Sequence, residues 1–178
     1  MAASPSDGVA PGALSLRELA GTPEDIAAMQ VVFAAAPGYF MAVQNAPAGP
    51  DEGADLFTGL PPGRSHADKL VFGLYAGDLA IGCADVVRGW NAPNKAIIGL
   101  LLLVEAWQGR GLGRDFASRI EQAIGRWPEV EIIRLGVVAA NVRALAFWRT
   151  QGYCETGERT RNPAFAAEIV VFEKARLR

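Results

Sequence analysis

Three glycines at alternate positions, Gly109, Gly111 and Gly113, come directly before a helical pattern and form the clearest chemical signal in the chain. Glycine tolerates positive φ and lets the backbone approach a ligand closely. The start of a helix presents unpaired N–H groups and the positive end of the helix dipole. Arg110 and Arg114 add positive charge beside this loop. The segment therefore predicts a site for a phosphorylated ligand.

Three phosphate-binding motifs contain glycines of this kind. A Walker A loop requires Gly-Lys-Ser/Thr after its glycines, where this chain has Arg114 and Asp115. The dinucleotide motif G-x-G-x-x-G requires a glycine or alanine where Arg114 stands, and a parallel sheet from the start of the chain. The third motif, Q/R-x-x-G-x-G/A after a central strand, is matched by Gln108, Gly111 and Gly113.

A second block, residues 141–153, follows one helix and one strand later. Its sequence, NVRALAFWRTQGY, is similar to the pattern N-x-x-A-x-x-F-Y-x-x-x-G-F. Together the two motifs resemble those of the GNAT superfamily, the N-acetyltransferases that use acetyl-coenzyme A. The motifs cover residues 95–157, and the expected element order agrees from residue 13 onward.

The resemblance implies where the cofactor would bind. In this family two parallel central strands diverge, and the pantetheine arm enters between them, paired with strand backbone groups like a short added strand. The residues implied for pantetheine are Leu102, Leu103, Val104 and Asn141, with Phe147 and Trp148 near the sulfur end. Those implied for the pyrophosphate are Gln108, Gly109, Arg110, Gly111, Leu112, Gly113 and Arg114. For the two aromatic side chains, ordinary packing of helix against sheet is the alternative.

The implied reaction is direct attack of a substrate amine on the thioester in a ternary complex, which requires orientation, a base and polarisation of the carbonyl. The family's tyrosine acid corresponds to Trp148, which cannot supply that proton. Tyr153 is the nearby alternative acid, although its place matches a core phenylalanine of the family. A thiol with a pKa of about 8.5 also leaves as the thiolate without an acid.

The general base is equally open. Some family members use a glutamate on the central strand, and the corresponding residue here is Ile97. Asp85 lies within an apolar strand, where a carboxylate either has a raised pKa or is paired, and it is the first candidate. We expect Glu105 to be a solvated turn residue and His66 to be exposed. A chain of water molecules is the remaining alternative.

The acceptor site is expected between the helices of residues 20–60 and the loop 158–163. Asp51 and Asp55 share a helical face and would attract a cationic amine, or would serve only as favourable charges at a helix start. Arg159 and Arg161 would suit an acidic acceptor instead. The other residues expected near this site are Tyr39, Phe40 and Glu52. The sequence does not decide the substrate.

Composition excludes several other chemistries. The chain of 178 residues has one histidine, two cysteines, and 17 basic residues against 19 acidic ones. A Cys/His metal site, a disulfide framework and a nucleic-acid-binding basic face are therefore not expected. Residues 1–12 lack the features of a signal peptide and predict a disordered tail, and no apolar run is long enough to span a membrane. We expect one cytoplasmic domain, residues 13–178, that uses acetyl-CoA and no metal.

These motifs require a mixed α/β fold to position them. Strands are predicted at 13–19, 70–75, 79–88, 95–104, 130–138, 153–157 and 167–174. A helix is predicted to follow Thr22 and to end at Pro37, with further helices at 39–44, 51–59, 112–127 and 142–150. The segment 95–138 reads as a right-handed βαβ crossover with two parallel strands, in an otherwise mostly antiparallel central sheet flanked by helices.

The leading hypothesis is an N-acetyltransferase that acts on a primary amine of a small molecule or protein. An acyl-CoA-binding module without turnover and a nucleotide-binding regulatory domain are the alternatives. Strand edges near the end of the chain make a homodimer a further expectation.

Overall fold

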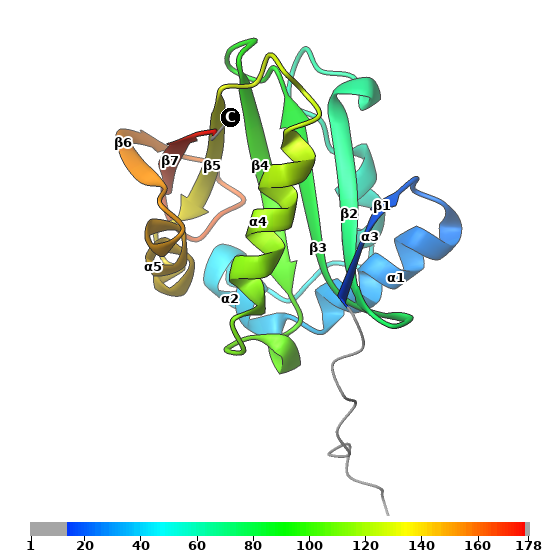
Figure 1. Ribbon diagram of the computed structural model, residues 1–178. Coiled ribbons are helices and arrows are strands. Elements are labelled where there is room, and N and C mark those ends of the chain that lie inside the picture. Colours follow the sequence, from blue (N-terminus) through cyan, green and yellow to red (C-terminus); the bar gives the residue numbers. More distant parts are fainter. Residues whose placement is uncertain (1–13, 177–178) are drawn as a thin grey trace, which may run out of the picture.

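The computed structural model describes residues 14–176, which form one seven-stranded sheet with helices on both faces (Figure 1). The strands are β1 (Leu14–Leu19), β2 (Lys69–Ala76), β3 (Leu79–Arg88), β4 (Lys95–Leu103), β5 (Ile132–Val138), β6 (Cys154–Thr160) and β7 (Ile169–Ala175). The helices are α1 (Pro23–Ala34), α2 (Pro37–Gln44), α3 (Glu52–Thr58), α4 (Leu112–Ile124) and α5 (Val142–Thr150), with 3-10 turns η1 (His66–Asp68) and η2 (Glu105–Trp107). The tail predicted for residues 1–12 lies outside the described residues.

The sheet order is β1-β2-β3-β4-β5-β7-β6, and β4 with β5 is the parallel pair of the sheet. All other neighbouring strands are antiparallel. The predicted mixed α/β class with one parallel crossover is therefore confirmed. The final strand β7 lies between β5 and β6, so the last two strands do not simply extend the sheet in chain order.

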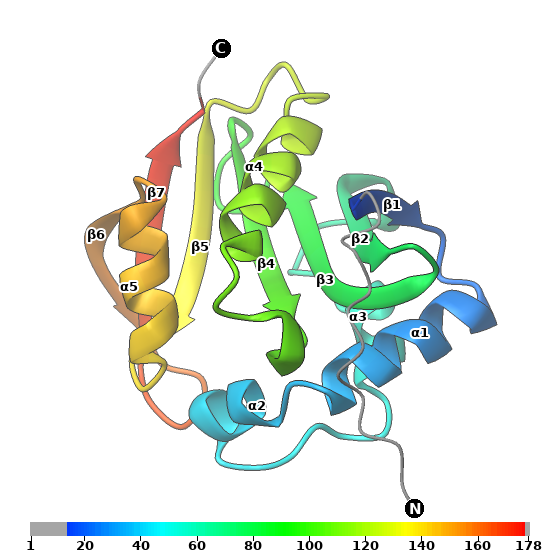
Figure 2. The same cartoon turned by 60° about the horizontal axis from the view of Figure 1, so that its bottom comes forward.

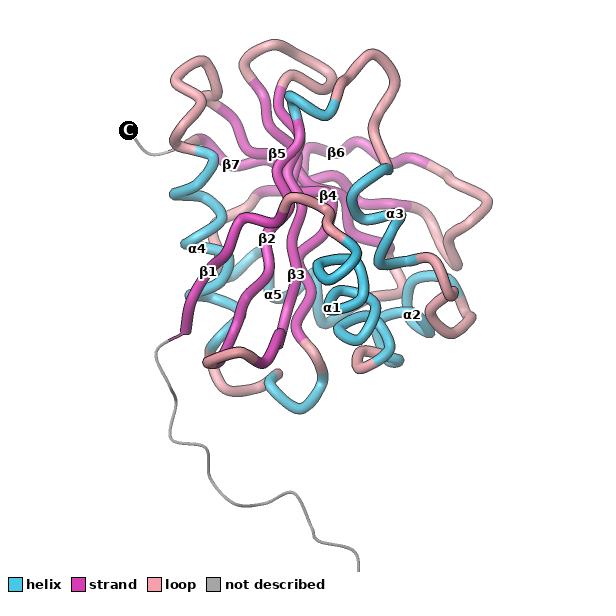
Figure 3. Tube along the Cα trace, turned by 90° about the vertical axis from the view of Figure 1, so that its right-hand side faces the viewer, coloured by secondary structure: helices cyan, strands magenta, loops and turns pink. Residues whose placement is uncertain are grey.

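The helices form two layers on opposite faces of the sheet (Figure 3). Helices α4 and α5 cover one face, and α1, α2 and α3 cover the other (Figures 1 and 3). Both layers supply fully buried side chains, such as Met29 and Val32 from α1 and Phe116 and Ile120 from α4. Each such side chain contributes about 1.5–3 kcal/mol relative to an exposed one, so the sheet is held from both sides.

Local signals explain the helix boundaries well. Thr22 and Asp25 form the predicted capping box: the Asp25 N–H donates to Thr22 Oγ1 at 3.2 Å, and the Thr22 N–H donates to Asp25 Oδ2 at 3.2 Å. Pro37 ends the first helical segment as predicted, but it also begins α2, two residues earlier than the pattern suggested. A proline in the first turn is compatible with a helix because its missing N–H has no partner there.

Strands β4 and β5 pair only near their beginnings and then diverge (Figure 2). The register joins Lys95–Ile98 to Ile132–Leu135, whereas β4 continues to Leu103 and β5 to Val138. On its other side β4 carries a β-bulge, because Asp85 pairs with Leu100 and Val86 with Ile98, which leaves Gly99 as the extra residue. A bulge bends and twists its strand. The divergent strands open the middle of the sheet at this point.

No single helix within residues 14–176 is long and apolar enough to cross a membrane. Helices α1 and α2 reach that length and hydropathy only when they are joined, and the chain bends by 75° between them.

Candidate active site

Two cavities meet where β4 and β5 diverge. The larger has a volume of about 500 Å³ and is lined by the glycine-rich segment, and we call it the loop cavity. The smaller, of about 330 Å³, is lined by β4, β5, β6 and β7 together with α2, and we call it the sheet cavity. Five residues line both cavities and form their junction, namely Tyr39, Leu101, Asn141, Ala144 and Trp148.

The loop cavity has the geometry expected of a phosphate site. Gly109 and Gly111 have φ of +73° and +78°, which side chains rarely allow. Gly111 is the N-cap of α4, and no side chain caps that helix, so its first N–H groups are left for a ligand. Arg114 and Arg143 line the cavity and supply positive charge. Arg143 was not anticipated from the sequence.

Most of the predicted cofactor residues do line the loop cavity. They are Leu102, Leu103, Gln108, Gly109, Gly111, Gly113, Arg114, Asn141, Phe147 and Trp148. Three others do not line it. Arg110 stacks its guanidinium over Trp107, at 5.3 Å from the ring centroid, and Leu112 and Val104 are likewise absent from the cavity wall.

The strand backbone corrects the predicted pairing site by one residue. The Val104 N–H donates to the Ile81 carbonyl of β3 at 3.0 Å. Because successive residues of a strand direct these groups to opposite sides, Leu102 also faces β3, whereas Leu101 and Leu103 face the gap. The Leu103 carbonyl accepts from Gln108 Nε2 at 2.8 Å. The strand backbone groups that face the gap therefore belong to Leu101 and Leu103, not to Leu102 and Val104, and of these the Leu103 carbonyl is bonded to Gln108.

Asn141 begins α5 as predicted, since its Oδ1 accepts the Ala144 N–H at 3.1 Å. That bond leaves Nδ2 as a donor at the junction of the cavities. Phe147 packs against the loop, because a Cβ placed on Gly113 would lie 3.3 Å from its ring. Trp148 is 7% exposed and contacts both Phe147 and Tyr153 edge to face, with ring centroids 5.0 Å apart in each pair.

Tyr153, the predicted acid, is placed away from both cavities. Its hydroxyl donates to Glu121 Oε1 on α4 at 3.0 Å, and Lys174 Nζ binds the same carboxylate. Burial and the neighbouring Glu121 charge raise the pKa of Tyr153 far above its ordinary value. The structure therefore gives Tyr153 a core position, as its match to the family's phenylalanine implied.

Asp85, the predicted base, is buried and paired. Its carboxylate lies 2.8 Å from Lys69 Nζ and accepts the Leu100 N–H beside the bulge. Burial raises the pKa of Asp85, and the Lys69 charge opposes that rise. Asp85 lines neither cavity, but a Cβ on Gly99, which does line the sheet cavity, would lie 2.8 Å from Asp85 Oδ1. The carboxylate thus sits directly behind the cavity wall.

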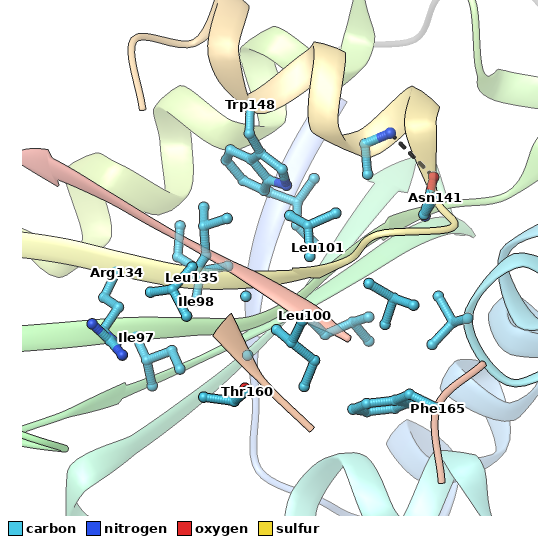
Figure 4. Close-up of a pocket in the computed structure, with 18 of the residues that line it drawn as sticks. Ile97, Ile98, Leu100, Leu101, Arg134, Leu135, Asn141, Trp148, Thr160 and Phe165 are labelled. Carbon is cyan, nitrogen blue, oxygen red and sulfur yellow. Dashed lines mark hydrogen bonds between the residues drawn. The ribbon is translucent and has the colours of Figure 1, made fainter. Parts of the chain in front are cut away.

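The sheet cavity is largely apolar, with the Arg134 side chain at one end (Figure 4). Arg134 belongs to an ion-pair network. Arg134 Nη1 lies 2.9 Å from Glu173 Oε1, and Arg134 Nη2 lies 2.6 Å from Glu158 Oε1. Lys95 Nζ lies 2.6 Å from the same Glu173 oxygen. Burial opposes the Arg134 charge, but the two carboxylates outweigh it and raise the pKa of Arg134. Burial likewise opposes the Glu173 charge, and bonds from Lys95 and Arg134 lower the pKa of Glu173.

Arg134 is the main functional candidate that the sequence reasoning missed. Its side chain is only 7% exposed, in a strand whose neighbours are apolar. An arginine within an apolar run signals a buried, paired charge, so the position was detectable but its partners were not.

Few of the predicted acceptor residues line the sheet cavity. Tyr39 does, as do Glu158 and Thr160 of the predicted segment 158–163, whereas Phe40, Asp51, Glu52, Asp55, Arg159 and Arg161 do not. Burial raises the pKa of Tyr39 well beyond its ordinary value, with Cys83, Asp85 and Glu52 adding to the effect. The Tyr39 phenol therefore stays protonated at the junction.

Glu105 is an exposed residue of the turn η2, as expected, but its side chain also makes a long-range contact that the sequence did not indicate. Its Oε1 accepts the Gly38 N–H at 2.6 Å, and its own N–H donates to the Ala35 carbonyl at 3.0 Å. The N-cap of α2, Ala36, has no capping side chain, so Glu105 caps the helix from 67 residues away. The end of β4 is thereby joined to the helix that carries Tyr39.

His66 begins the turn η1 and is exposed, as expected. Within residues 14–176, no cluster of three or more His, Cys, Asp or Glu side chains could hold a metal ion.

Structures of similar fold have been solved. An acetyltransferase from Thermus thermophilus is 26% identical, with a TM-score of 0.70, covering 91% of this chain and 96% of that chain. An aminoglycoside acetyltransferase in complex with coenzyme A is 18% identical, with a TM-score of 0.69 and coverage of 92% and 95%. A spermidine N-acetyltransferase from Vibrio cholerae in complex with CoA and spermine is 15% identical, with a TM-score of 0.68 and coverage of 92% and 95%. The last two matches show similarity of fold alone.

No functionally curated protein matches the chain significantly in sequence. The sequence profile of the acetyltransferase (GNAT) family matches residues 37–153, which is well over half of the chain and contains the glycine loop, the divergent strands and the Asn141 block. The chain belongs to the acetyltransferase (GNAT) family.

Proposed function

We propose that the protein is an N-acetyltransferase that transfers the acetyl group of acetyl-CoA to a primary amine. One observation carries this proposal: the loop cavity and the sheet cavity meet at the divergent strands β4 and β5. A phosphate-binding cavity on one side and a separate, mostly apolar cavity on the other allow a donor and an acceptor to bind at the same time. Crystal structures of fold relatives with CoA support the choice of donor.

The residues of the loop cavity fit a CoA ester. The N–H groups at the start of α4 would hold the pyrophosphate, and Arg114 and Arg143 would balance its charge. The Leu101 carbonyl and the Leu103 N–H would pair with the pantetheine amides, and Asn141 Nδ2 would add a donor. These contacts direct the thioester toward the junction.

At the junction, the acceptor amine attacks the thioester carbonyl: a C–N bond forms, the C–S bond breaks, and the sulfur leaves as a thiolate. The backbone N–H of Leu101, which lines both cavities, would stabilise the negative charge that develops on the carbonyl oxygen. A thiol with a pKa of about 8.5 is a good leaving group near neutral pH, so the step does not require an acid in place of Trp148.

The attacking nitrogen must first lose a proton. Asp85 pairs in register with Leu100, next to the junction, and its carboxylate lies behind Gly99. We assign proton removal to Asp85 through a water molecule beside Gly99. The raised pKa of the buried carboxylate makes it a better base than an exposed one.

Binding and turnover measured on the same preparation test the proposal. We expect saturable binding of CoA by calorimetry and an increase in free thiol that requires acetyl-CoA, an amine and the protein together. Binding of CoA without thiol release from a broad panel of primary amines would favour the binding module, for which Trp148 in the acid position is the supporting feature. Tighter binding of NAD or ATP than of CoA would favour the nucleotide-binding alternative and overturn both.

A further inference from the structure

The sheet cavity is small and carries little charge. Among the residues that line its roughly 330 Å³, two are charged, Arg134 and Glu158, and they are paired with each other. We infer that the acceptor is a small primary monoamine with an apolar body and no charged group at its far end. This inference rests on the proposed function, because it assumes that the sheet cavity holds the acceptor.

The cavity has two distinct ends (Figure 4). At one end lie Arg134 and Ile97, which are register partners on β5 and β4. At the other end lies Asn141, which belongs to the junction with the loop cavity. From Ile97 to Leu101, the strand advances four residues, or roughly 13 Å at about 3.3 Å per residue. An amine that reaches the thioester at the junction therefore directs the rest of its body toward Arg134.

The walls between the two ends are mostly apolar, with Thr160 and Tyr39 as uncharged polar residues. Leu100 and Phe165 face this space from β4 and from the loop between β6 and β7 (Figure 4). Trp90, Val43 and Val171 complete the wall. Such surfaces gain about 25 cal/mol for each Å² of apolar ligand area removed from water, and they offer nothing to replace the hydration of a charged group. The body of the acceptor is therefore hydrocarbon, aliphatic or aromatic.

A charged group on the acceptor would be unfavourable at the Arg134 end of the cavity. Arg134 is held by Glu158 and Glu173, and Glu173 is also held by Lys95. Two cations and two anions give this network a formal charge of zero. A carboxylate on the acceptor would lie near two carboxylates already bound to Arg134, and a second ammonium would find no unpaired carboxylate. Arg134 and Glu173 are largely buried, whereas the Glu158 side chain is 45% exposed, so an unpaired charge is disfavoured most on the Arg134 side of this end.

Polycationic acceptors, such as polyamines and aminoglycosides, require several carboxylates around their binding site. The acidic residues that could have supplied them, Asp51, Glu52 and Asp55, do not line the sheet cavity. Glu52 Oε1 instead accepts the Gly49 N–H at 3.2 Å. The distribution of charge around the sheet cavity thus favours an apolar monoamine over a polyamine or an amino acid as the acceptor.

Matched acceptor pairs test the inference. With acetyl-CoA and the full chain, kcat/KM is measured for hexylamine against 1,6-diaminohexane, and for 2-phenylethylamine against phenylalanine. We expect the monoamine to exceed its charged counterpart by at least about tenfold in both pairs. A diamine or amino acid that is acetylated equally well, or the absence of turnover with every amine, would overturn the inference. Thiol release from acetyl-CoA with any amine of a broad primary-amine panel, recorded in parallel, shows separately whether the proposed function holds.

A charge change at the far end provides a sharper test. Glu158→Gln removes one carboxylate from the network and leaves a net positive charge beside the cavity. We expect the ratio of kcat/KM for phenylalanine to that for 2-phenylethylamine to rise about tenfold, with unchanged affinity for CoA. The control is Glu155→Gln on the same strand, where the carboxylate binds Arg149 and Arg159 and lines neither cavity. An unchanged ratio in Glu158→Gln, or an equal rise in the control, would place the acceptor's far end elsewhere.

Discussion

The loop cavity and the sheet cavity share a junction but are built in different ways. The loop cavity depends mainly on backbone: positive φ at Gly109 and Gly111, the uncapped start of α4, and the free strand groups of Leu101 and Leu103. The sheet cavity depends on side chains that converge from α2 and four strands. A backbone site holds a chemical group common to all CoA esters, whereas a side-chain site can change its specificity by single substitutions. The contrast supports the proposal that the donor binds in the first cavity and that the second cavity selects the acceptor.

The largest expected effect concerns the buried charge of the sheet cavity. Arg134→Met leaves Glu173 with Lys95 alone and Glu158 without its partner, so we expect unfolding free energy to fall by about 3 kcal/mol. Denaturant titration measures this loss. The matched control is Arg126→Met, whose pair with Glu18 is equally short at 2.8 Å but half exposed, and which should cost less than about 1 kcal/mol. An equal loss of unfolding free energy in the two variants would show that burial does not make the Arg134 ion pairs more important for stability than the surface pair of Arg126.

The next effect isolates the backbone site. Gly111→Val forces a branched side chain into a φ of +78°, so the local backbone shifts and its N–H groups move away from the ligand. We expect CoA affinity to fall about 100-fold, roughly 2.7 kcal/mol, by calorimetry.

The matched control for that change is Gly77→Val in the turn between β2 and β3. Gly77 also has a positive φ, +63°, and also has open space where a Cβ would lie. Both variants should lose similar stability, but only Gly111→Val should lose CoA binding. Normal CoA affinity in Gly111→Val would move the pyrophosphate away from this loop.

The smallest effect concerns the contact that links the two cavities. Glu105→Ala removes the cap of α2, and we expect a loss of about 1 kcal/mol in unfolding free energy and a several-fold rise in acceptor KM. The readout specific to positioning is rescue of KM by Glu105→Gln, which retains an acceptor oxygen. Glu52→Ala removes a comparable contact to Gly49, three residues away, and serves as the control. A KM that rises equally in the control would show general loosening rather than misplacement of α2.

Most residues of the loop cavity could be predicted from the sequence, whereas the Arg134 network of the sheet cavity could not, because only the former are close together in the chain. Gln108, Gly111 and Asn141 were predicted as site residues because the loop and the start of α5 each consist of neighbouring residues, whose spacing forms a sequence motif. Arg134 binds Glu158 and Glu173, which are 24 and 39 residues away, and this contact depends on β7 lying between β5 and β6. No local pattern contains that strand order.

Strand register explains the remaining differences. The seven strands and the parallel pair followed from apolar periodicity and the glycine loop, and their bounds agree within a few residues. The bulge at Gly99, however, shifts every later residue of β4 relative to β3. A one-residue shift exchanges the two sides of a strand, so the sequence placed the free backbone groups at Leu102 and Val104 rather than at Leu101 and Leu103. Likewise, the cap that Glu105 supplies to α2 is a long-range contact that no spacing rule predicts.

The position of β7 also bears on the order in which the molecule is assembled. The loop cavity is lined by residues up to Gln151, so none of its lining residues comes from the last strand. The sheet cavity needs Ile169 and Val171, and Arg134 needs Glu173. During synthesis every lining residue of the loop cavity is therefore made before β7, whereas the sheet cavity is complete only when β7 pairs with β5. If the proposed function holds, insertion of the final strand couples completion of the fold to the choice of acceptor.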